Sequence, residues 1–354
     1  MFQVYALEQQ IQQRMQTQKV PGLALAVVKD EEIIYARGFG VTSMEADSAL
    51  PVTPKTLFLI GSTAKPLTGT AIMQLVQASK LDLDLPVHTY VDWLRFHLED
   101  AEKRITLRML MSHTAGLHSS VDAFGRRDLG ALAAYVHEEI PQRLFVAPPG
   151  KVYFYSNDGL IVAGYIAEVV SGQYFPSLMQ QLVFDPLEMS RTTYDTTVAM
   201  TYPLAQEHDW LEDGTVRVLH RFVDNMAGSP AGPAPMSTVL DLANFAILHL
   251  NQGKFHGKQI LSSESVKAMH TPQVAFHTVN DAGYGLTFRM EMYKGKHLLW
   301  HNGLARATTS IFCLVPEERI GITMLFNGLF ASFGAPGIVY SLIDQLLGLP
   351  ERTP

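Results

Sequence analysis

The chain has 354 residues, a length typical of about two structural units, and 47% of them are hydrophobic while 17% are charged. That composition excludes a long disordered chain. With 27 Lys and Arg against 34 Asp and Glu, net charge −7, we expect no nucleic-acid partner. The single cysteine, Cys313, excludes an intrachain disulfide, which fits a reducing compartment.

The first predicted elements are a helix and a β-hairpin. Along the N-terminal segment apolar residues recur at helical spacing, namely Val4, Leu7, Ile11 and Met15. This segment has no early Lys or Arg and no apolar core, so we expect no signal peptide and a cytoplasmic protein. Two β-rich runs follow at 22–30 and 31–40, and the polar residues between them suit a hairpin turn.

Beyond Ser62 the hydrophobic pattern becomes helical. The helical runs lie at 69–80, 105–113, 129–140 and 159–172. Residues 198–236 are irregular and rich in Pro, Gly and Ala, with a turn expected at 212–214. A helix near 237–251 has Ser237 and Thr238 at its start and Asp241 in its first turn.

The C-terminal part returns to strands. They are expected at 284–295, 296–303, 307–316 and 319–327, with a last helix at about 335–347. The 24 uncharged residues at 320–343 are long enough to cross a bilayer. Because Asn, Gly and Pro interrupt this stretch, a buried strand, a loop and a helix fit it better, and we expect no membrane span.

The β-rich ends and the helical middle together predict an α+β fold. Antiparallel strands from both termini share one sheet flanked by helices, in a discontinuous mixed domain of residues 1–78 and 205–354. Residues 79–204 form an all-helical domain.

Several familiar chemical motifs are missing. No serine lies in G-x-S-x-G, no H-E-x-x-H occurs, and the 13 histidines are scattered. We therefore expect no metal and no cofactor.

One local pattern offers nucleophilic chemistry. Ser62 and Lys65 lie three residues apart at the start of a helical run, so their side chains share a helix face. A desolvated amine can accept the proton of a serine hydroxyl, and the helix N-terminus suits a developing oxyanion. The pattern is short and occurs by chance, and by itself a helix cap followed by a surface lysine is the simpler explanation.

Two further triplets have the same ambiguity. Tyr155, Ser156 and Asn157 follow a Pro-Pro-Gly turn and could simply cap the next helix. His301, Asn302 and Gly303 close a strand pattern and could form a hairpin turn.

Together, in this order, S-T-A-K, Y-S-N and H-N-G resemble the S-x-x-K, Y-x-N and K-T-G motifs of the penicillin-recognising serine hydrolases, in the class C β-lactamase branch. The H-x-G form of the third motif is similar to that family's esterases and D-amino-acid-specific peptidases. The resemblance extends from about residue 4 to 346. It implies an antiparallel sheet from both termini, an all-helical domain, and an active site between them.

By this resemblance, Ser62 is the acylated nucleophile, while Lys65 and Tyr155 share the general base and acid roles. The backbone N–H groups of Ser62 and Leu304 form the oxyanion hole. Asn157 orients the substrate or the lysine.

The remaining motif residues receive lesser roles from the resemblance. Asn302 and Gly303 form the strand edge beside the scissile bond. His113, in Ser-His-Thr, is expected to be a hydrogen-bonded structural histidine, and Cys313 a buried inert thiol.

The third motif has His301 where the class C branch has lysine, so we expect one of two site cations to be missing and Lys65 to carry more of the basicity. Neutral His301 favours uncharged substrates, and its protonation near pH 6 would favour carboxylates. Arg306 replaces part of a usual Gly-rich run and could supply a cation instead.

The predicted function is a serine hydrolase that acts through an acyl-enzyme on carboxylic esters or related small acyl substrates. Alternatives are a D-amino-acid-specific peptidase or amidase, a weak β-lactamase, a transacylase, and a non-catalytic penicillin-sensing domain. The expected partners are an ester, amide or β-lactam substrate and, at most, a second copy in a homodimer.

Overall fold

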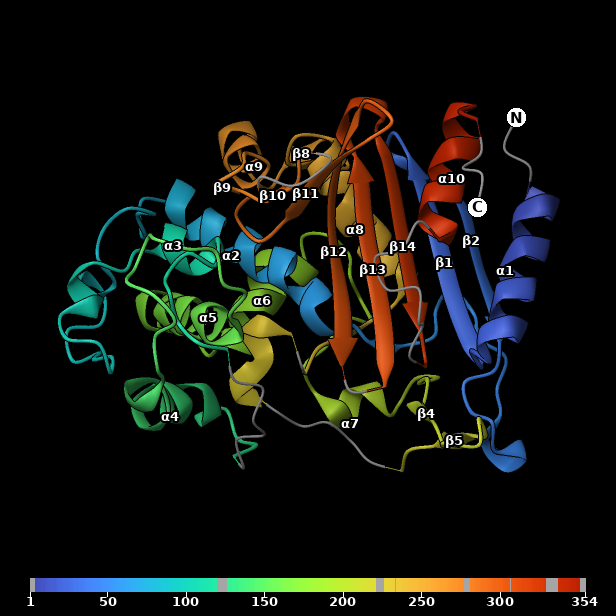
Figure 1. Ribbon diagram of the computed structural model, residues 1–354, viewed down its shortest axis with the longest axis horizontal. Coiled ribbons are helices and arrows are strands. Elements are labelled where there is room, and N and C mark those ends of the chain that lie inside the picture. The colour runs from blue at the N-terminus through green and yellow to red at the C-terminus, as the bar shows by residue number, and fades with distance from the viewer. Residues whose placement is uncertain are drawn as a thin grey trace.

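A computed structural model describes residues 4–119, 126–220, 226–232, 234–276, 281–305, 307–328 and 337–350. Its centre is an eight-stranded antiparallel sheet in the order β2-β1-β14-β13-β12-β11-β10-β9. Helices cover both faces of the sheet, and a helical region lies beside it (Figure 1). The fold is therefore α+β, as predicted.

The α-helices and β-strands follow one another along the chain in a mixed order. They are α1 Val4–Gln18, β1 Gly22–Lys29, β2 Glu32–Gly40, β3 Phe58–Leu59, α2 Ala64–Gln77, α3 Leu107–Met111, α4 Ala131–Glu138, α5 Asn157–Ser171, α6 Phe175–Met179, α7 Thr196–Ala199, β4 His208–Trp210, β5 Val216–Val218, β6 Met236–Ser237, α8 Val239–Leu250, β7 Lys254–Phe255, β8 Lys258–Gln259, α9 Ser263–Met269, β9 Val274–Ala275, β10 Gly283–Tyr284, β11 Arg289–Tyr293, β12 Lys296–Ala305, β13 Thr308–Val315, β14 Ile320–Phe326 and α10 Ile338–Leu347.

The two ends of the chain meet inside the sheet, where β1 lies between β2 and β14. Strand β1 pairs with β2 on one side and with β14 on the other. Because successive strand side chains point to opposite faces, Leu23 and Leu25 pack in one apolar cluster while Ala24 and Ala26 pack in another. Burial on both faces explains why β1 and β14 are continuous hydrophobic runs.

Each apolar cluster has its own helical cover. On the outer face, α1 and α10 bring Leu7, Ile11 and Leu342 against the sheet, and the two helices lie side by side in Figure 1. On the inner face, α8 packs against β14 and β1. The inner cluster continues without a break into the helical region built around α2 and α5.

Most predicted elements are present, with differences at their edges. The helix near 237–251 begins as expected, since Thr238 accepts a hydrogen bond from the Asp241 N–H. The turn at 212–214 is confirmed, but two short strands, β4 and β5, flank it in a stretch expected to be irregular. The domain limits at 78/79 and 204/205 stay a prediction.

The described part of α10 begins at Ile338, three residues after the expected start of the last helix. The uncharged stretch from 320 contains strand β14. No helix in the described ranges is long and apolar enough to cross a membrane.

A pair of histidines, buried His249 and half-buried His270, lies behind α2. The Thr70 hydroxyl donates to the Pro66 carbonyl, so it accepts from His249 Nε2, 3.0 Å away. His249 Nδ1 then accepts from His270 Nε2 at 3.1 Å. These bonds use both ring nitrogens of His249 and Nε2 of His270 in their neutral forms, and burial lowers the pKa of His270 to about 3.

We expect this pair to make the protein sensitive to acid. An unfolded histidine has a pKa near 6.5, so stability is highest above that pH and falls as the pH drops towards 3, because only the unfolded state gains a proton. For His270 alone, the loss of unfolding free energy at pH 5 is about 2 kcal/mol.

The measurement is urea unfolding at pH 7.5 and at pH 5. The difference in unfolding free energy between the two pH values should be smaller in His270→Gln than in the wild type. An exposed control, His88→Gln, should keep the full effect. Equal pH dependence in all three proteins would contradict the prediction.

Candidate active site

The serine turn lies between the sheet and α2. Ser62 lies in a 3-10 turn of residues Gly61–Thr63 that leads directly into α2. Strand β13 holds this turn through Ser310, whose hydroxyl donates to the Ile60 carbonyl at 2.5 Å and accepts from Thr63 Oγ1 at 2.7 Å. Ser62 is therefore fixed at a helix N-terminus, where unpaired N–H groups favour negative charge.

Lys65 is not a surface lysine. Its side chain is fully buried, and its amine nitrogen lies 2.9 Å from Ser62 Oγ, 2.8 Å from Asn157 Oδ1 and 2.6 Å from the Ala231 carbonyl oxygen. Burial, together with the charge of Arg289, holds the pKa of Lys65 well below its usual range. The alternative of a cap followed by an exposed lysine is therefore wrong.

Burial favours the neutral form of the Lys65 amine, and its three partners decide how that form is used. A neutral amine has two N–H donors and one lone pair. The carbonyl oxygens of Asn157 and Ala231 only accept, so they take both donors. In this neutral form the lone pair faces Ser62 Oγ, 2.9 Å away, and can accept the serine proton. This is the arrangement that a serine needs in order to lose its proton to a lysine.

Tyr155 lies next to the same serine. Its hydroxyl is hydrogen-bonded to Ser62, and its ring centroid is 4.8 Å from Lys65 Nζ. Burial raises the pKa of Tyr155 strongly, although the Ser62 bond and the Arg289 charge oppose the rise. The resting phenol therefore keeps its proton, which favours Lys65 as the group that accepts the serine proton.

The second triplet both caps a helix and contributes to the site. Ser156 is the N-cap of α5 and accepts from the Gly159 N–H at 3.2 Å. Asn157, the first residue of that helix, accepts a hydrogen bond from Lys65. The capping explanation is therefore correct for Ser156, while its neighbour Asn157 contacts the predicted catalytic lysine.

The third triplet lies inside β12 and not in a hairpin turn. His301 is buried, and its Nδ1 donates to the Asn302 carbonyl at 2.7 Å. Its Nε2 accepts from the Tyr284 hydroxyl at 3.1 Å, and that hydroxyl accepts from His113 Nε2 at 3.0 Å. His113 Nδ1 in turn accepts the Ser156 N–H at 3.1 Å, which confirms its structural role. Tyr284 links the two histidines, and sequence reasoning did not single it out.

This chain of bonds changes the expectation for His301. Both ring nitrogens are already used in the neutral form, and burial holds the pKa of His301 well below its usual range. The expectation that His301 becomes protonated near pH 6 is therefore wrong. The Asn302 side chain lines a small pocket with Trp300 on the outer face of the sheet. Roles of His301 and Asn302 in substrate binding stay predictions.

Sequence reasoning also missed a cation. Arg289 begins β11, and its guanidinium carbon lies 5.4 Å from the ring centroids of Tyr155 and Trp300. Its charge lowers the pKa values of Lys65 and His301. The expectation that the site lacks a second cation is therefore wrong. In the sequence, the residues around Arg289 predicted only a strand. A charged arginine inside an otherwise apolar strand pattern is the signal that could have identified this cation. Arg306, the other candidate, lies outside the described residues.

Two glycines allow the serine turn to lie against β12. Gly61 has φ of 52°, and a Cβ there would lie 2.8 Å from the Leu304 nitrogen. A Cβ on Gly303 would lie 1.9 Å from the Ile60 carbonyl oxygen and 2.3 Å from Ser310 Oγ. The predicted oxyanion donor Leu304 thus has its backbone next to the serine turn, while its own side chain is exposed.

Gly303→Ala should therefore damage the site. The added methyl would push Ile60 and Ser310 away, and such overpacking costs about 1–3 kcal/mol. Displacing Ser62 by about 1 Å would slow acylation by roughly a hundredfold, measured as the rate of fluorophosphonate labelling. The control is Gly295→Ala, at a turn with φ of 78° and open space, which should lose about 1 kcal/mol of stability and keep the rate. Equal labelling rates in the two variants would contradict the prediction.

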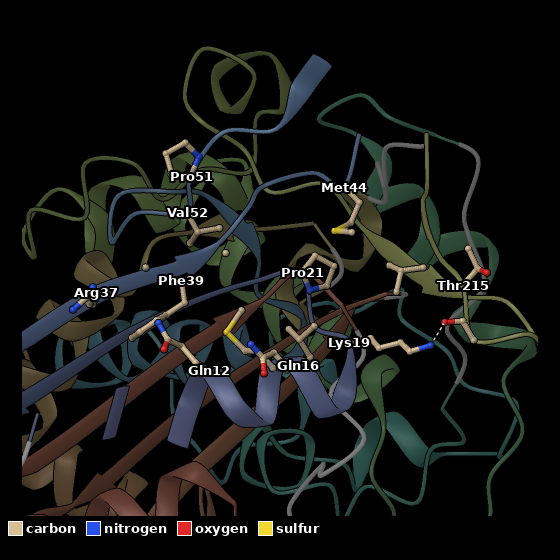
Figure 2. A pocket seen from close by; sticks show the side chains of 16 residues that line it. Gln12, Gln16, Lys19, Pro21, Arg37, Phe39, Met44, Pro51, Val52 and Thr215 are labelled. Carbon is tan, nitrogen blue, oxygen red and sulfur yellow. Dashed lines mark hydrogen bonds between the residues drawn. The ribbon is translucent and has the colours of Figure 1, made fainter. Parts of the chain in front are cut away.

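A larger groove lies elsewhere on the protein. It has a volume of about 990 Å³ and is lined by α1, β2 and the β4–β5 turn. Figure 2 shows Gln12, Gln16 and Arg37 along it, and Lys19 donates to the Gly214 carbonyl at 2.6 Å. No predicted site residue lines this groove. Within the described ranges, no three His, Cys, Asp or Glu side chains lie close enough together to hold a metal.

Comparison with known proteins finds the same resemblance along almost the whole chain. The family model described as Beta-lactamase matches residues 7–339. Penicillin-binding protein 4 of Amycolatopsis lactamdurans is 28% identical, over 94% of this chain and 88% of its own. Unguisins hydrolase ungD of Aspergillus violaceofuscus is 27% identical over 98% of this chain, which spans only 65% of that longer protein.

The solved structures include a similar fold. The octameric penicillin-binding protein homologue from Pyrococcus abyssi superposes with a TM-score of 0.81 and 25% identity, over 98% of this chain and 78% of its own.

Proposed function

The chain belongs to the beta-lactamase family of serine hydrolases, and we propose that it hydrolyses carboxylic esters or related small acyl substrates through an acyl-enzyme on Ser62. The observation that carries this proposal is the buried Lys65 amine, 2.9 Å from Ser62 Oγ and held by two carbonyl oxygens. A hydroxyl beside a desolvated amine at a helix N-terminus is suited to acyl transfer.

In the first half of the reaction Ser62 Oγ attacks the substrate carbonyl carbon and its proton passes to Lys65 Nζ. The N–H groups of Ser62 and Leu304 stabilise the oxyanion. The tetrahedral intermediate collapses as the bond to the leaving group breaks. Tyr155 gives its proton to the leaving oxygen and regains one from Lys65, so that the amine is neutral again.

In the second half a water molecule attacks the acyl carbon and loses a proton to the Lys65 and Tyr155 pair. Ser62 Oγ leaves as the carboxylic acid forms, and the pair returns that proton to the serine. The raised pKa of Tyr155 suits this relay, because a phenol that stays protonated is available as an acid in each half-reaction.

A second candidate function is hydrolysis of an amide, as in a D-amino-acid-specific peptidase. An amine leaves only after protonation, so a protonated phenol beside the nucleophile favours this reaction. Both reactions use the same acyl-enzyme and differ in the leaving group. Oligomeric state stays a prediction, monomer or homodimer.

The proposal is tested by labelling the wild-type protein with a fluorophosphonate and measuring its intact mass. The expected result is one adduct per chain. In a separate experiment, the unlabelled protein should give a burst of p-nitrophenol followed by steady turnover of a p-nitrophenyl ester. A panel of esters, D-peptides and a chromogenic cephalosporin then separates the candidates. A burst without turnover would indicate a sensor, and no adduct at all would overturn the proposal.

A further inference from the structure

Strand β2 forms an open edge of the large sheet (Figure 1). Towards its end the strand is covered, since the Val52 N–H donates to the Gly40 carbonyl at 3.0 Å. In the described part of the chain, only β1 pairs with residues 32–37. The consecutive side chains of Ile33 and Ile34 are 36% and 44% exposed there. An uncovered edge with exposed apolar side chains is a template for pairing with another strand.

A β-bulge interrupts this open part of β2. Tyr35 lies opposite Val27 of β1, and Ile33 lies opposite the next residue, Val28. Ile34 is therefore an extra residue between two paired ones. Because side chains alternate between the two faces of a strand, the extra residue shifts the alternation by one position. The bulge thus decides which side chains before and after it share a face of the sheet.

The shift brings two opposite charges to one face. Glu32 lies opposite Lys29, and Arg37 lies opposite Leu25. Lys29 and Leu25 are four residues apart in β1, so they share a face, and their partners Glu32 and Arg37 share it too. In a strand without a bulge, residues five apart would lie on opposite faces. Arg37 already binds Glu8 of α1, but half of its side chain is exposed and accessible to a second carboxylate.

We propose that residues 32–37 of β2 pair antiparallel with the same residues of a second copy of this chain, across a two-fold axis. In this register Glu32 of each copy lies opposite Arg37 of the other, on the same face. A two-fold contact repeats every pair, so the dimer has two such pairs. An unrelated strand would have to supply an acidic and a basic residue at the same spacing, whereas a second copy does so automatically.

The apolar side chains fit the same register. Ile33 and Ala36 lie opposite Val28 and Ala26, which are two residues apart in β1, so they share the other face. The pairing therefore places Ile33 of each copy beside Ala36 of the other. A register shifted by one residue would bring Glu32 opposite Ala36, from the wrong face. Three strands separate β2 from β12, and formation of the dimer does not depend on the proposed function.

The test is sedimentation velocity over a concentration series. The wild type should show a monomer–dimer equilibrium. Glu32→Arg and Arg37→Glu each turn both opposite-charge pairs into like-charge pairs, so each should weaken dimerisation by roughly ten- to a hundredfold. In an equal mixture of these two variants, a mixed dimer again has opposite charges in both pairs. The mixture should therefore dimerise about as strongly as the wild type, and so should the double variant.

The matched control is Glu138→Arg, which makes the same change of charge on the exposed side of α4 and should dimerise like the wild type. Thermal unfolding shows whether each variant is folded. Because Arg37→Glu places a second carboxylate beside Glu8, Glu8→Gln/Arg37→Glu replaces it if it is unstable. A wild type that is monomeric at every concentration would overturn the proposal. So would a dimer that neither variant weakens, or weakened variants that mixing does not restore.

Discussion

Ser62→Ala is expected to abolish fluorophosphonate labelling and to lower ester kcat by at least about a thousandfold. Loss of a nucleophile in related catalytic groups has effects of this size. The substitution removes only the hydroxyl at the start of α2, while Ser310 still holds the turn through Ile60 and Thr63. The fold should therefore be unchanged, and the loss should be chemical.

The measurement is intact mass after labelling, together with steady-state turnover of a p-nitrophenyl ester. The control is Ser263→Ala, at an exposed start of α9, which should label and turn over like the wild type. Full labelling of Ser62→Ala would mean that another residue is the nucleophile. The roles assigned to Lys65 and Tyr155 would then be wrong as well.

The second large effect is expected from the proton relay. Lys65→Met keeps the stem and removes the amine, while Tyr155→Phe removes only the hydroxyl. General acid–base catalysis contributes about 10²–10⁴-fold, and we expect each variant to lose a factor in this range. Because both groups contact the same serine and pass one proton between them, the losses should not multiply.

The double variant should therefore be no more than about threefold slower than the slower single variant in kcat/KM. Lys65→Met leaves the oxygens of Asn157 and Ala231 without their donor, so its unfolding free energy is measured first to show that the protein is folded. Losses that multiply would show that the two residues act independently, and the shared relay would be rejected.

Much of this site was predictable because its motifs are local. Ser62 and Lys65 are three residues apart, and a helix of any sequence would bring them to one face. The α+β fold was predictable because β1 and β14 are apolar on both faces, as a central strand must be. The short strands β4 and β5 were missed because three-residue strands leave almost no periodic signal.

The electrostatics of the site were not predictable in the same way. We expected the site to lack a second cation because His301 replaces a lysine in the third motif, and that motif was considered alone. The observed cation, Arg289, comes from the neighbouring strand, and the register between β11 and β12 sets its distance from Tyr155. The neutrality of His301 likewise depends on Tyr284, 17 residues away in the sequence, and on His113, which comes from another part of the chain.

The pairing of β1 with β14 has a consequence for synthesis of the chain on the ribosome. Leu23 and Phe326 are partners across this ladder although they are about 300 residues apart. At about 5–20 residues per second, the N-terminal hairpin waits roughly 15–60 s for its neighbour. During that time β1 has an open edge, and its inner apolar face stays uncovered until α8 has emerged; both features promote aggregation. Nascent chains should thus depend on a chaperone until β14 has emerged, and coding changes that slow translation before Ile320 should lower the soluble yield.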